Sequence, residues 1–295
     1  LHLLSRRQRQ MCIRDRPITY SLLLKTGIMD SIRISIVQTD IVWENKQENL
    51  RLLHKKLQSL CGTTEIVVLP EMFSTGFSMQ SKTLAEPNSG ETITTLKLWA
   101  RQFQIAICGS YIATDNRLFY NRAFVLTPEG EEFYYDKRHL FRMGREAEHF
   151  SAGTKRLILP YLEWNICLQV CYDLRFPVWS RNINNEYDLL IYVANWPIPR
   201  RPVWDTLLRA RAFENQCYVC GVNRTGTDGY HLEYNGGSKI YSAFGEEIAS
   251  LPDGREGIAT ATLNLSALRQ FREKFPVWKD ADLSLIHISE PTRRT

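Results

Sequence analysis

The stretch LQVCYDLRFPVW, Leu168–Trp179, joins the end of an apolar run to a charged, turn-prone segment. The apolar run completes a strand that we predict over Trp164–Val170, so Cys171 lies directly beyond a strand end. Loops at strand ends are where α/β folds bring functional side chains together. A single cysteine is more often a small buried hydrophobe, so Cys171 has to be judged together with the rest of the chain.

Outward from this stretch, short β-branched runs alternate with amphipathic segments. In chain order, this pattern predicts strands at Ile32–Gln38, Glu65–Leu69, Ile105–Ala113, Phe119–Thr127, Glu132–Lys137, Trp164–Val170, Leu189–Val193, Cys217–Val222, Asn235–Tyr241 and Ile258–Leu263. It predicts helices at Asn45–Leu60, Thr92–Phe103, Trp204–Asn215 and Ser266–Lys274.

This order of elements implies two kinds of strand connection. A helix between two strands gives parallel neighbours, whereas the turn TPEG at 127–130 gives an antiparallel hairpin. We therefore predict an α/β fold of layered sheets with helices outside. No linker-like composition or repeat interrupts residues 29–283, which indicates a single domain.

The net charge of +5 comes from the two ends of the chain. Residues 1–28 carry six basic side chains against Asp15, and residues 284–295 carry two against Glu290. The body, residues 29–283, holds 29 basic and 30 acidic side chains. A nearly neutral body gives no electrostatic reason to expect nucleic acid or an anionic membrane as a partner.

The two ends also share a pattern that the body lacks. Met11–Asp15 (MCIRD) and Ser284–Ile288 (SLIHI) can be encoded by one DNA element in opposite orientations, which resembles translated sequencing-library adapter. An Arg-rich organellar targeting peptide is the alternative for residues 1–28. We expect 1–28 to be a non-native extension, 29–283 the single domain and 284–295 a non-native tail.

Apolar runs and cysteines indicate the compartment. No run approaches the ~20 uninterrupted apolar residues of a transmembrane helix, so we expect no membrane segment and a cytoplasmic location. The body's cysteines lack the spacing of a secreted disulfide framework, and we expect them to be reduced. They are Cys61, Cys108, Cys167, Cys171, Cys217 and Cys220. The histidines lack zinc-site spacing, so we predict no metal.

Three strand ends carry an ionisable residue: Glu71, Lys137 and Cys171. A thiol of ordinary pKa is only a few per cent ionised at neutral pH. A working cysteine therefore needs a base and a group that stabilises negative charge. Glu71 and Lys137 would supply them. Each residue alone has a structural explanation, as a cap, a surface charge or a core thiol, and the spacing does not show that the three meet.

Longer motifs around these residues have a known counterpart. The stretches VVLPEMFSTGF, YYDKRHLFRMG and QVCYDLRFPVW resemble, in this order, the Glu, Lys and Cys signatures of the nitrilase (carbon–nitrogen hydrolase) superfamily. The run VANWPIPRRPVWDTLLRARAFENQCYVCGVNRTG is similar to the omega-amidase branch. The resemblance covers residues 31–280.

The resemblance implies a four-layer α-β-β-α sandwich of the nitrilase type over residues 29–283, usually a homodimer, without cofactor or metal. It implies that Glu71, Lys137 and Cys171 are catalytic, with the backbone N–H of Tyr172 facing the oxyanion. In the family, a second glutamate occupies a motif Glu-x-x-x-(aromatic or aliphatic)-x-x-Gly. Glu146 matches it through Phe150 and Gly153, whereas Glu148 does not. Arg145 stands in this loop where a smaller residue is expected.

The implied reaction is hydrolysis of the terminal amide of a short α-keto dicarboxylic acid, of the α-ketoglutaramate or α-ketosuccinamate type, through a cysteine thioester. Arg175 could pair the carboxylate of this small-molecule amide, or it could pair Asp173 and fix the loop. Phe73, Trp196 and Pro197 could form an apolar wall of the pocket, or they could be ordinary core.

Two other functions stay open. The same chemistry could serve deaminated glutathione or an N-carbamoyl compound, and an inactive binding protein could use the same fold. The remaining cysteines are better explained by packing. Cys217-Tyr-Val-Cys220 has redox-motif spacing, but it lies in a strand-like run, and redox pairs usually sit at a helix N-terminus.

Overall fold

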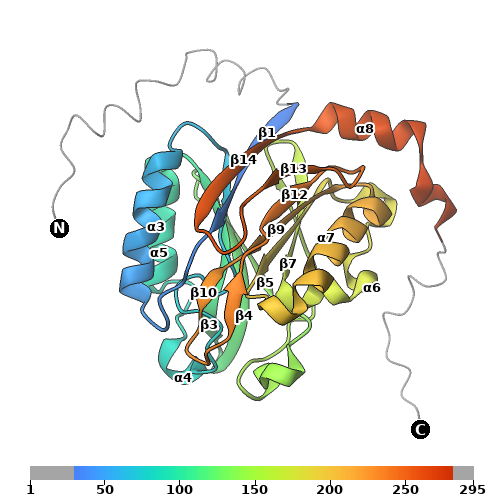
Figure 1. Cartoon of the computed structure of the whole chain (residues 1–295). Coiled ribbons are helices and arrows are strands. Elements are labelled where there is room, and N and C mark those ends of the chain that lie inside the picture. The colour runs from blue at the N-terminus through green and yellow to red at the C-terminus, as the bar shows by residue number, and fades with distance from the viewer. Residues whose placement is uncertain (1–29, 282–295) are drawn as a thin grey trace, which may run out of the picture.

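A computed structural model describes residues 30–281. The extension and tail that we expect at 1–28 and 284–295 lie outside these residues, as do Met29 and the last two residues of the predicted body. Two six-stranded sheets face each other, with helices on both outer sides (Figure 1). The predicted four-layer α-β-β-α sandwich is confirmed.

The first sheet has the order β14-β1-β2-β3-β4-β5. Its strands are β1 Ser31–Gln38, β2 Ile66–Val68, β3 Ala106–Asp115, β4 Leu118–Leu126, β5 Glu132–Asp136 and β14 Gly257–Asn264. Strand β2 pairs in parallel with β1 and β3, while the other pairs are antiparallel. The mixture of connections predicted from the order of elements is therefore present.

Two amphipathic helices cover the outer face of this sheet: α3 Lys46–Leu60 and α5 Glu91–Phe103. Asn45 caps α3 by accepting a hydrogen bond from the N–H of Glu48. The buried residues Leu50, Leu53 and Leu57 pack with α5 and the strands beneath. Burial of one such leucine stabilises the fold by about 1.5–3 kcal/mol.

Strand β1 shows how the two faces of the sheet are divided. Ile32, Ile34 and Ile36 point into the core between the sheets, whereas Val37 points to the helices. This follows from the period of two along a strand. Arg33 and Ser35 alternate with the isoleucines in this strand, and this period of two is why the sequence predicted it.

The second sheet has the order β13-β12-β9-β8-β7-β6. Its strands are β6 Leu157–Tyr161, β7 Trp164–Val170, β8 Leu189–Ala194, β9 Tyr218–Asn223, β12 Lys239–Tyr241 and β13 Glu247–Ser250. Helix α7 Arg201–Asn215 lies on its outer side and buries Trp204, Leu208 and Ala212. Helix α8 Leu265–Lys274 follows β14.

Short elements complete the chain. A small hairpin joins β10 Thr225–Thr227 to β11 Glu233–Asn235. The short helices are α4 Ser81–Leu84, α6 Pro177–Ser180, η1 Arg142–Gly144, η2 Glu146–Glu148, η3 Cys171–Arg175, η4 Ile183–Asn185, η5 Ile198–Arg200 and η6 Val277–Asp280.

One predicted strand is wrong. Asn235–Tyr241 is not a single strand, because two glycines between β11 and β12 interrupt the extended conformation. Gly236 and Gly237 have φ of 79° and 81°, in the left-handed region that interrupts a strand. The two halves of the predicted strand therefore belong to different sheets.

Candidate active site

Loops at the ends of strands from both sheets bring the candidate residues together. Glu71 lies beyond β2, Lys137 is the first residue after β5, and Cys171 is the first after β7. Asn195 follows β8 in the same way. The structure thus joins three residues that the sequence separates by up to 100 positions.

Cys171 begins the helix η3 in a strained backbone conformation. Its φ is 45°, a left-handed value that is uncommon for a residue with a side chain. Such strain costs about 1–3 kcal/mol and persists only where the surroundings impose it. Tyr172 follows in the first turn of η3, where N–H groups have no acceptor within the helix.

Asp173 anchors this turn to the segment that carries Lys137. Its carboxylate is fully buried and accepts hydrogen bonds from the N–H of Val170 at 3.0 Å and the hydroxyl of Tyr135 at 2.7 Å. It also accepts one from the N–H of His139 at 2.9 Å. The position of Cys171 is therefore coupled to β5 and the residues after it.

Glu71, Lys137 and Glu146 form a buried ion cluster. The three side chains are fully inaccessible to solvent. Lys137 Nζ lies 2.9 Å from Oε1 of Glu71 and donates to both carboxylate oxygens of Glu146 at 3.1 and 2.9 Å. The N–H of Phe141 donates to Glu146 Oε2 at 2.5 Å, so the loop itself holds this carboxylate.

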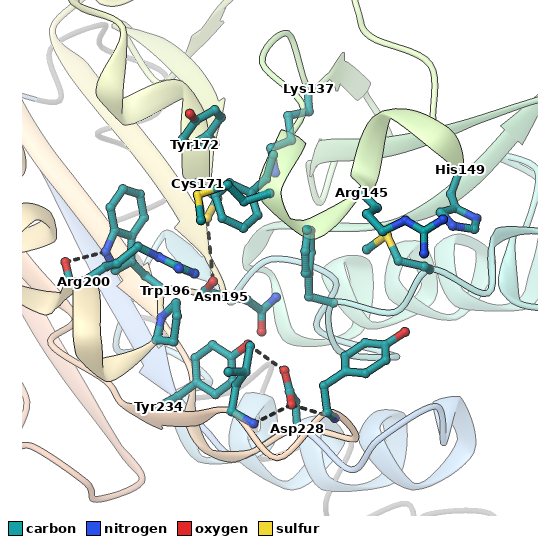
Figure 2. Close-up of a pocket in the computed structure, with 18 of the residues that line it drawn as sticks. Lys137, Arg145, His149, Cys171, Tyr172, Asn195, Trp196, Arg200, Asp228 and Tyr234 are labelled. Atoms are coloured by element: carbon teal, nitrogen blue, oxygen red, sulfur yellow. Dashed lines mark hydrogen bonds between the residues drawn. The ribbon is translucent and has the colours of Figure 1, made fainter.

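Cys171 faces the same cluster. Its Sγ is 3.8 Å from the carbonyl oxygen of Asn195, and its side chain is only 8% exposed (Figure 2). The N–H of Asn195 donates to Glu71 Oε2 at 2.8 Å, while its side chain donates to the carbonyl of Glu71 at 2.6 Å. Asn195 thus links the nucleophile candidate to the base candidate.

Burial and charge set the protonation of the cluster. Burial, followed by the charge of Glu71, raises the pKa of the Cys171 thiol well above its usual value, and Lys137 offsets this only in part. Burial alone would lower the pKa of Lys137, but Glu146 and Glu71 outweigh it and raise that pKa. At neutral pH Lys137 is a cation and Cys171 a neutral thiol.

Two residues of the cluster were not predicted from the sequence. Asn121, in β4, donates from Nδ2 to Glu71 Oε1 at 2.7 Å and to Glu146 Oε1 at 3.1 Å. Ser110, in β3, donates to Asn121 Oδ1 at 3.1 Å. Both lie inside strand-like runs, and nothing in those runs marks them as different from neighbouring buried residues.

A cavity of about 350 Å³ opens beside Cys171. In Figure 2, Cys171 and Lys137 approach it from one side, and Asp228 and Tyr234 lie on the opposite side. Asp228 holds this wall by accepting from the N–H groups of Tyr230 and Leu232 at 2.8 and 2.9 Å and from the Tyr234 hydroxyl at 2.8 Å.

Three arginines line the cavity: Arg145, Arg175 and Arg200. Arg145, in a left-handed conformation at the end of η1, is paired with Glu148 at 2.6 Å. Arg175 lies over the ring of Trp196 at 5.3 Å and Arg200 over that of Phe141 at 4.9 Å. Within residues 30–281, no carboxylate forms a salt bridge with either of these two.

The remaining predicted site residues separate into two groups. Trp196 and Pro197 line the cavity together with Arg175. Phe73 does not, because it packs against Phe124 in the core between the first sheet and its helices. The partners of Asp173 are Tyr135, Val170 and His139, so the suggested pair with Arg175 is absent from the described residues.

The other described thiols do not line the cavity. Cys108, Cys167, Cys217 and Cys220 are fully buried, and none forms a disulfide within the described part of the chain. No group of three His, Cys, Asp or Glu side chains in residues 30–281 could hold a metal ion. Among the helices of this range, none combines the length and apolar character needed to cross a bilayer.

The sequence profile described as carbon–nitrogen hydrolase matches residues 33–273. The chain belongs to this family. This carbon–nitrogen hydrolase is 43% identical over 256 residues to the omega-amidase YafV of Escherichia coli strain K12, with 86% of this chain and 98% of the relative covered. It is 32% identical over 252 residues to a 2-oxoglutaramate amidase of Bacillus subtilis, with coverage of 84% and 96%.

A solved structure extends the similarity to three dimensions. XC1258 of Xanthomonas campestris, a CN-hydrolase superfamily protein with an arsenic adduct in its active site, has a TM-score of 0.84 and 39% identity. The alignment covers 86% of this chain and 98% of XC1258. These relatives identify the present carbon–nitrogen hydrolase as an amidase.

Proposed function

We propose that this amidase hydrolyses the terminal amide of a short α-keto dicarboxylic acid, of the α-ketoglutaramate or α-ketosuccinamate type. The observation that carries this proposal is the pair Arg175 and Arg200 beside the buried Cys171. Two arginines without a carboxylate partner in the described residues supply the charge that a substrate carboxylate requires. Similarity to relatives named omega-amidase and 2-oxoglutaramate amidase supports the same substrate class.

In the first half-reaction, Cys171 Sγ attacks the amide carbon while Glu71 accepts the thiol proton. The raised pKa of the thiol means that attack and deprotonation occur together, because little free thiolate exists at neutral pH. Lys137 and the N–H of Tyr172 stabilise the oxyanion; loss of one such donor typically costs about 3–4 kcal/mol. The C–N bond then breaks, Glu71 returns the proton to nitrogen, and ammonia leaves a thioester.

In the second half-reaction, water attacks the thioester carbon and transfers a proton to Glu71. The C–S bond breaks, the proton passes to sulfur, and the carboxylic acid is released. Glu146, which holds Lys137 through both carboxylate oxygens, keeps the ammonium group in position throughout. The cycle consumes one water and one amide and forms one ammonia and one acid.

The size of the cavity favours a short substrate. A volume of about 350 Å³ lies at the lower end of the range of roughly 300–1,000 Å³ for small-molecule sites. Deaminated glutathione carries two further residues beyond the α-ketoglutaramyl group. The cavity therefore supports the short omega-amide over this alternative. The named amidase relatives speak against an inactive binding protein.

A panel of substrates tests the proposal. Ammonia release is measured from α-ketoglutaramate, α-ketosuccinamate, deaminated glutathione, an N-carbamoyl amino acid and a neutral amide of similar length. We expect the first two to give the highest kcat/KM. Arg175→Ala and Arg200→Ala should raise the KM for α-ketoglutaramate but leave the neutral amide unchanged. A preference for deaminated glutathione or for the N-carbamoyl compound would contradict the proposal.

The proposal extends to the organisation of the protein. We propose residues 29–283 as one catalytic domain that forms a homodimer in the cytoplasm, with 1–28 and 284–295 as non-native additions. Light scattering on the full chain and on the chain cut to 29–283 tests the oligomeric state. A monomer in both cases would contradict the homodimer.

A further inference from the structure

The catalytic cluster buries two carboxyl groups around a single ammonium group. Glu71 and Glu146 are two carboxylates, Lys137 is one ammonium group, and all three are shielded from water. A buried charge is tolerated only when hydrogen-bond donors replace the lost water. The protein therefore has to supply N–H groups in addition to Lys137.

Asn121 is a neutral residue that supplies such donors to both carboxylates. Its single amide nitrogen donates to Glu71 at 2.7 Å and to Glu146 at 3.1 Å, so one rigid group bridges the two carboxylates. Lys137 Nζ donates to the same two carboxylates. Asn121 is fully buried in β4, two strands away from β2.

Ser110 fixes the orientation of the Asn121 amide. Its hydroxyl donates to Asn121 Oδ1 at 3.1 Å and accepts from the N–H of Met72 at 2.8 Å. With Oδ1 occupied in this way, the Nδ2 hydrogens point to the carboxylates. Because Met72 directly follows Glu71, the same hydroxyl also holds the backbone beside the base.

We infer that Asn121, oriented by Ser110, is a positioning residue that holds Glu71 against Cys171 and sets its separation from Glu146. This inference rests on the proposed role of Glu71 as the base. Asn121 occupies Glu71 Oε1 together with Lys137, whereas Oε2 accepts from the N–H of Asn195. Asn121 therefore confines the carboxylate so that its Oε2 side serves the thiol.

Two substitutions distinguish the loss of hydrogen-bond donation by Asn121 from the loss of its side-chain volume. Asn121→Ala removes the amide, and Asn121→Asp keeps its shape but can supply at most one hydrogen to the two carboxylates. We expect both to lower kcat by about 10–100-fold, because a base displaced by about 1 Å loses its alignment. KM for the amide substrate should stay within about threefold of wild type, because Asn121 does not line the cavity.

A second readout needs no substrate. The rate at which iodoacetamide alkylates Cys171, followed by mass spectrometry, should fall in both variants, because Glu71 no longer assists the thiol. Ser110→Ala, which keeps Asn121 but frees its carbonyl, should lower kcat and the alkylation rate in the same direction. Ser110→Ala keeps the test decisive if the Asn121 variants fail to fold.

Asn182→Ala is the matched control. Asn182 is buried and its amide donates to the carbonyl groups of Tyr187 and Asn215, away from the cavity. It should lower Tm but leave kcat and the alkylation rate unchanged. Wild-type kcat in Asn121→Asp, or an alkylation rate equal to that of the control, would overturn the inference. If wild type hydrolyses no amide of the panel, the proposed substrate fails, while the alkylation rates still decide the role of Asn121.

Discussion

At the scale of single residues, the protonation of Cys171 decides how the chemistry can run. Burial and the adjacent Glu71 carboxylate raise the pKa of its thiol, so the enzyme does not store a thiolate. In the proposed mechanism proton removal accompanies attack, and Glu71, whose carboxylate contacts Lys137 and Asn195, is the proposed proton acceptor. General-base assistance of this kind is worth about 10²–10⁴ in rate.

Replacement of Glu71 tests this dependence. Glu71→Gln keeps the shape of the side chain and removes its basicity, so we expect kcat to fall about 10²–10⁴-fold with a small change in KM. Steady-state ammonia release provides the measurement. Glu86→Gln, which removes a carboxylate paired with Lys46 outside the cavity, is the control and should be fully active. Activity of Glu71→Gln within threefold of wild type would exclude Glu71 as the base.

The sequence predicted some of these residues and could not predict others. Glu71, Lys137, Cys171 and Glu146 follow from motifs with characteristic neighbours, and the structure places all four in one cluster. Asn121 lies within an ordinary strand, where a buried amide has no distinct pattern. Arg200 lies in a run rich in proline and arginine, so only the fold could show that it faces the cavity.

At the scale of elements, the loop from η1 to β6 positions Lys137 and Glu146. The N–H of Gly153 donates to the carbonyl of Lys137 at 2.9 Å. A Cβ atom built on Gly153 would overlap the carbonyl oxygen of Asp136, the last residue of β5. Phe150 is buried beside Met72 and Ile112. The aromatic residue and the glycine of the motif therefore anchor the loop at two points.

Gly153→Ala should push the loop that carries Gly153 away from the end of β5. The added methyl group forces the backbone near Lys137 to move, so we expect a loss of about 1–3 kcal/mol in stability and a fall in kcat. Urea unfolding and ammonia release measure the two effects. Gly257→Ala is the control, because its methyl group meets only the flexible end of Leu251. Equal stability and activity of the two variants would contradict this role of Gly153.

Long elements were predictable, whereas several short ones were not. The buried strand β7 was predicted with its bounds, and the helices α3 and α7 within a few residues, because their periodic apolar patterns are extended. Strands β6, β10 and β13 were missed. They contain three to five residues, too few for a periodic pattern, and tertiary pairing determines them.

At the scale of the whole molecule, buried thiols make stability depend on pH. Burial raises the pKa of Cys108, Cys217 and Cys220, and that of Cys167 to about 11. Below the unfolded pKa of about 9, both states keep the proton and stability is fully present. Above it, the unfolded thiols ionise while the native ones do not, and stability is lost as the pH rises toward the native pKa.

We therefore expect the urea midpoint to fall between pH 8 and pH 10. Across this window one buried thiol lowers the free energy of unfolding by about 1.4 kcal/mol in total. Cys220→Val, which keeps an apolar side chain in β9, should reduce the fall by the contribution of one thiol. An unchanged midpoint across this range, or an equal slope in Cys220→Val, would contradict the effect of burial.

The most direct test of the mechanism is whether Cys171 carries the acyl group during turnover. The full chain is mixed with α-ketoglutaramate, quenched with acid and analysed by tandem mass spectrometry together with ammonia release. We predict a thioester on Cys171 and ammonia in wild type, and a folded Cys171→Ala variant with neither. Ammonia release by Cys171→Ala at the wild-type rate would contradict the cysteine mechanism.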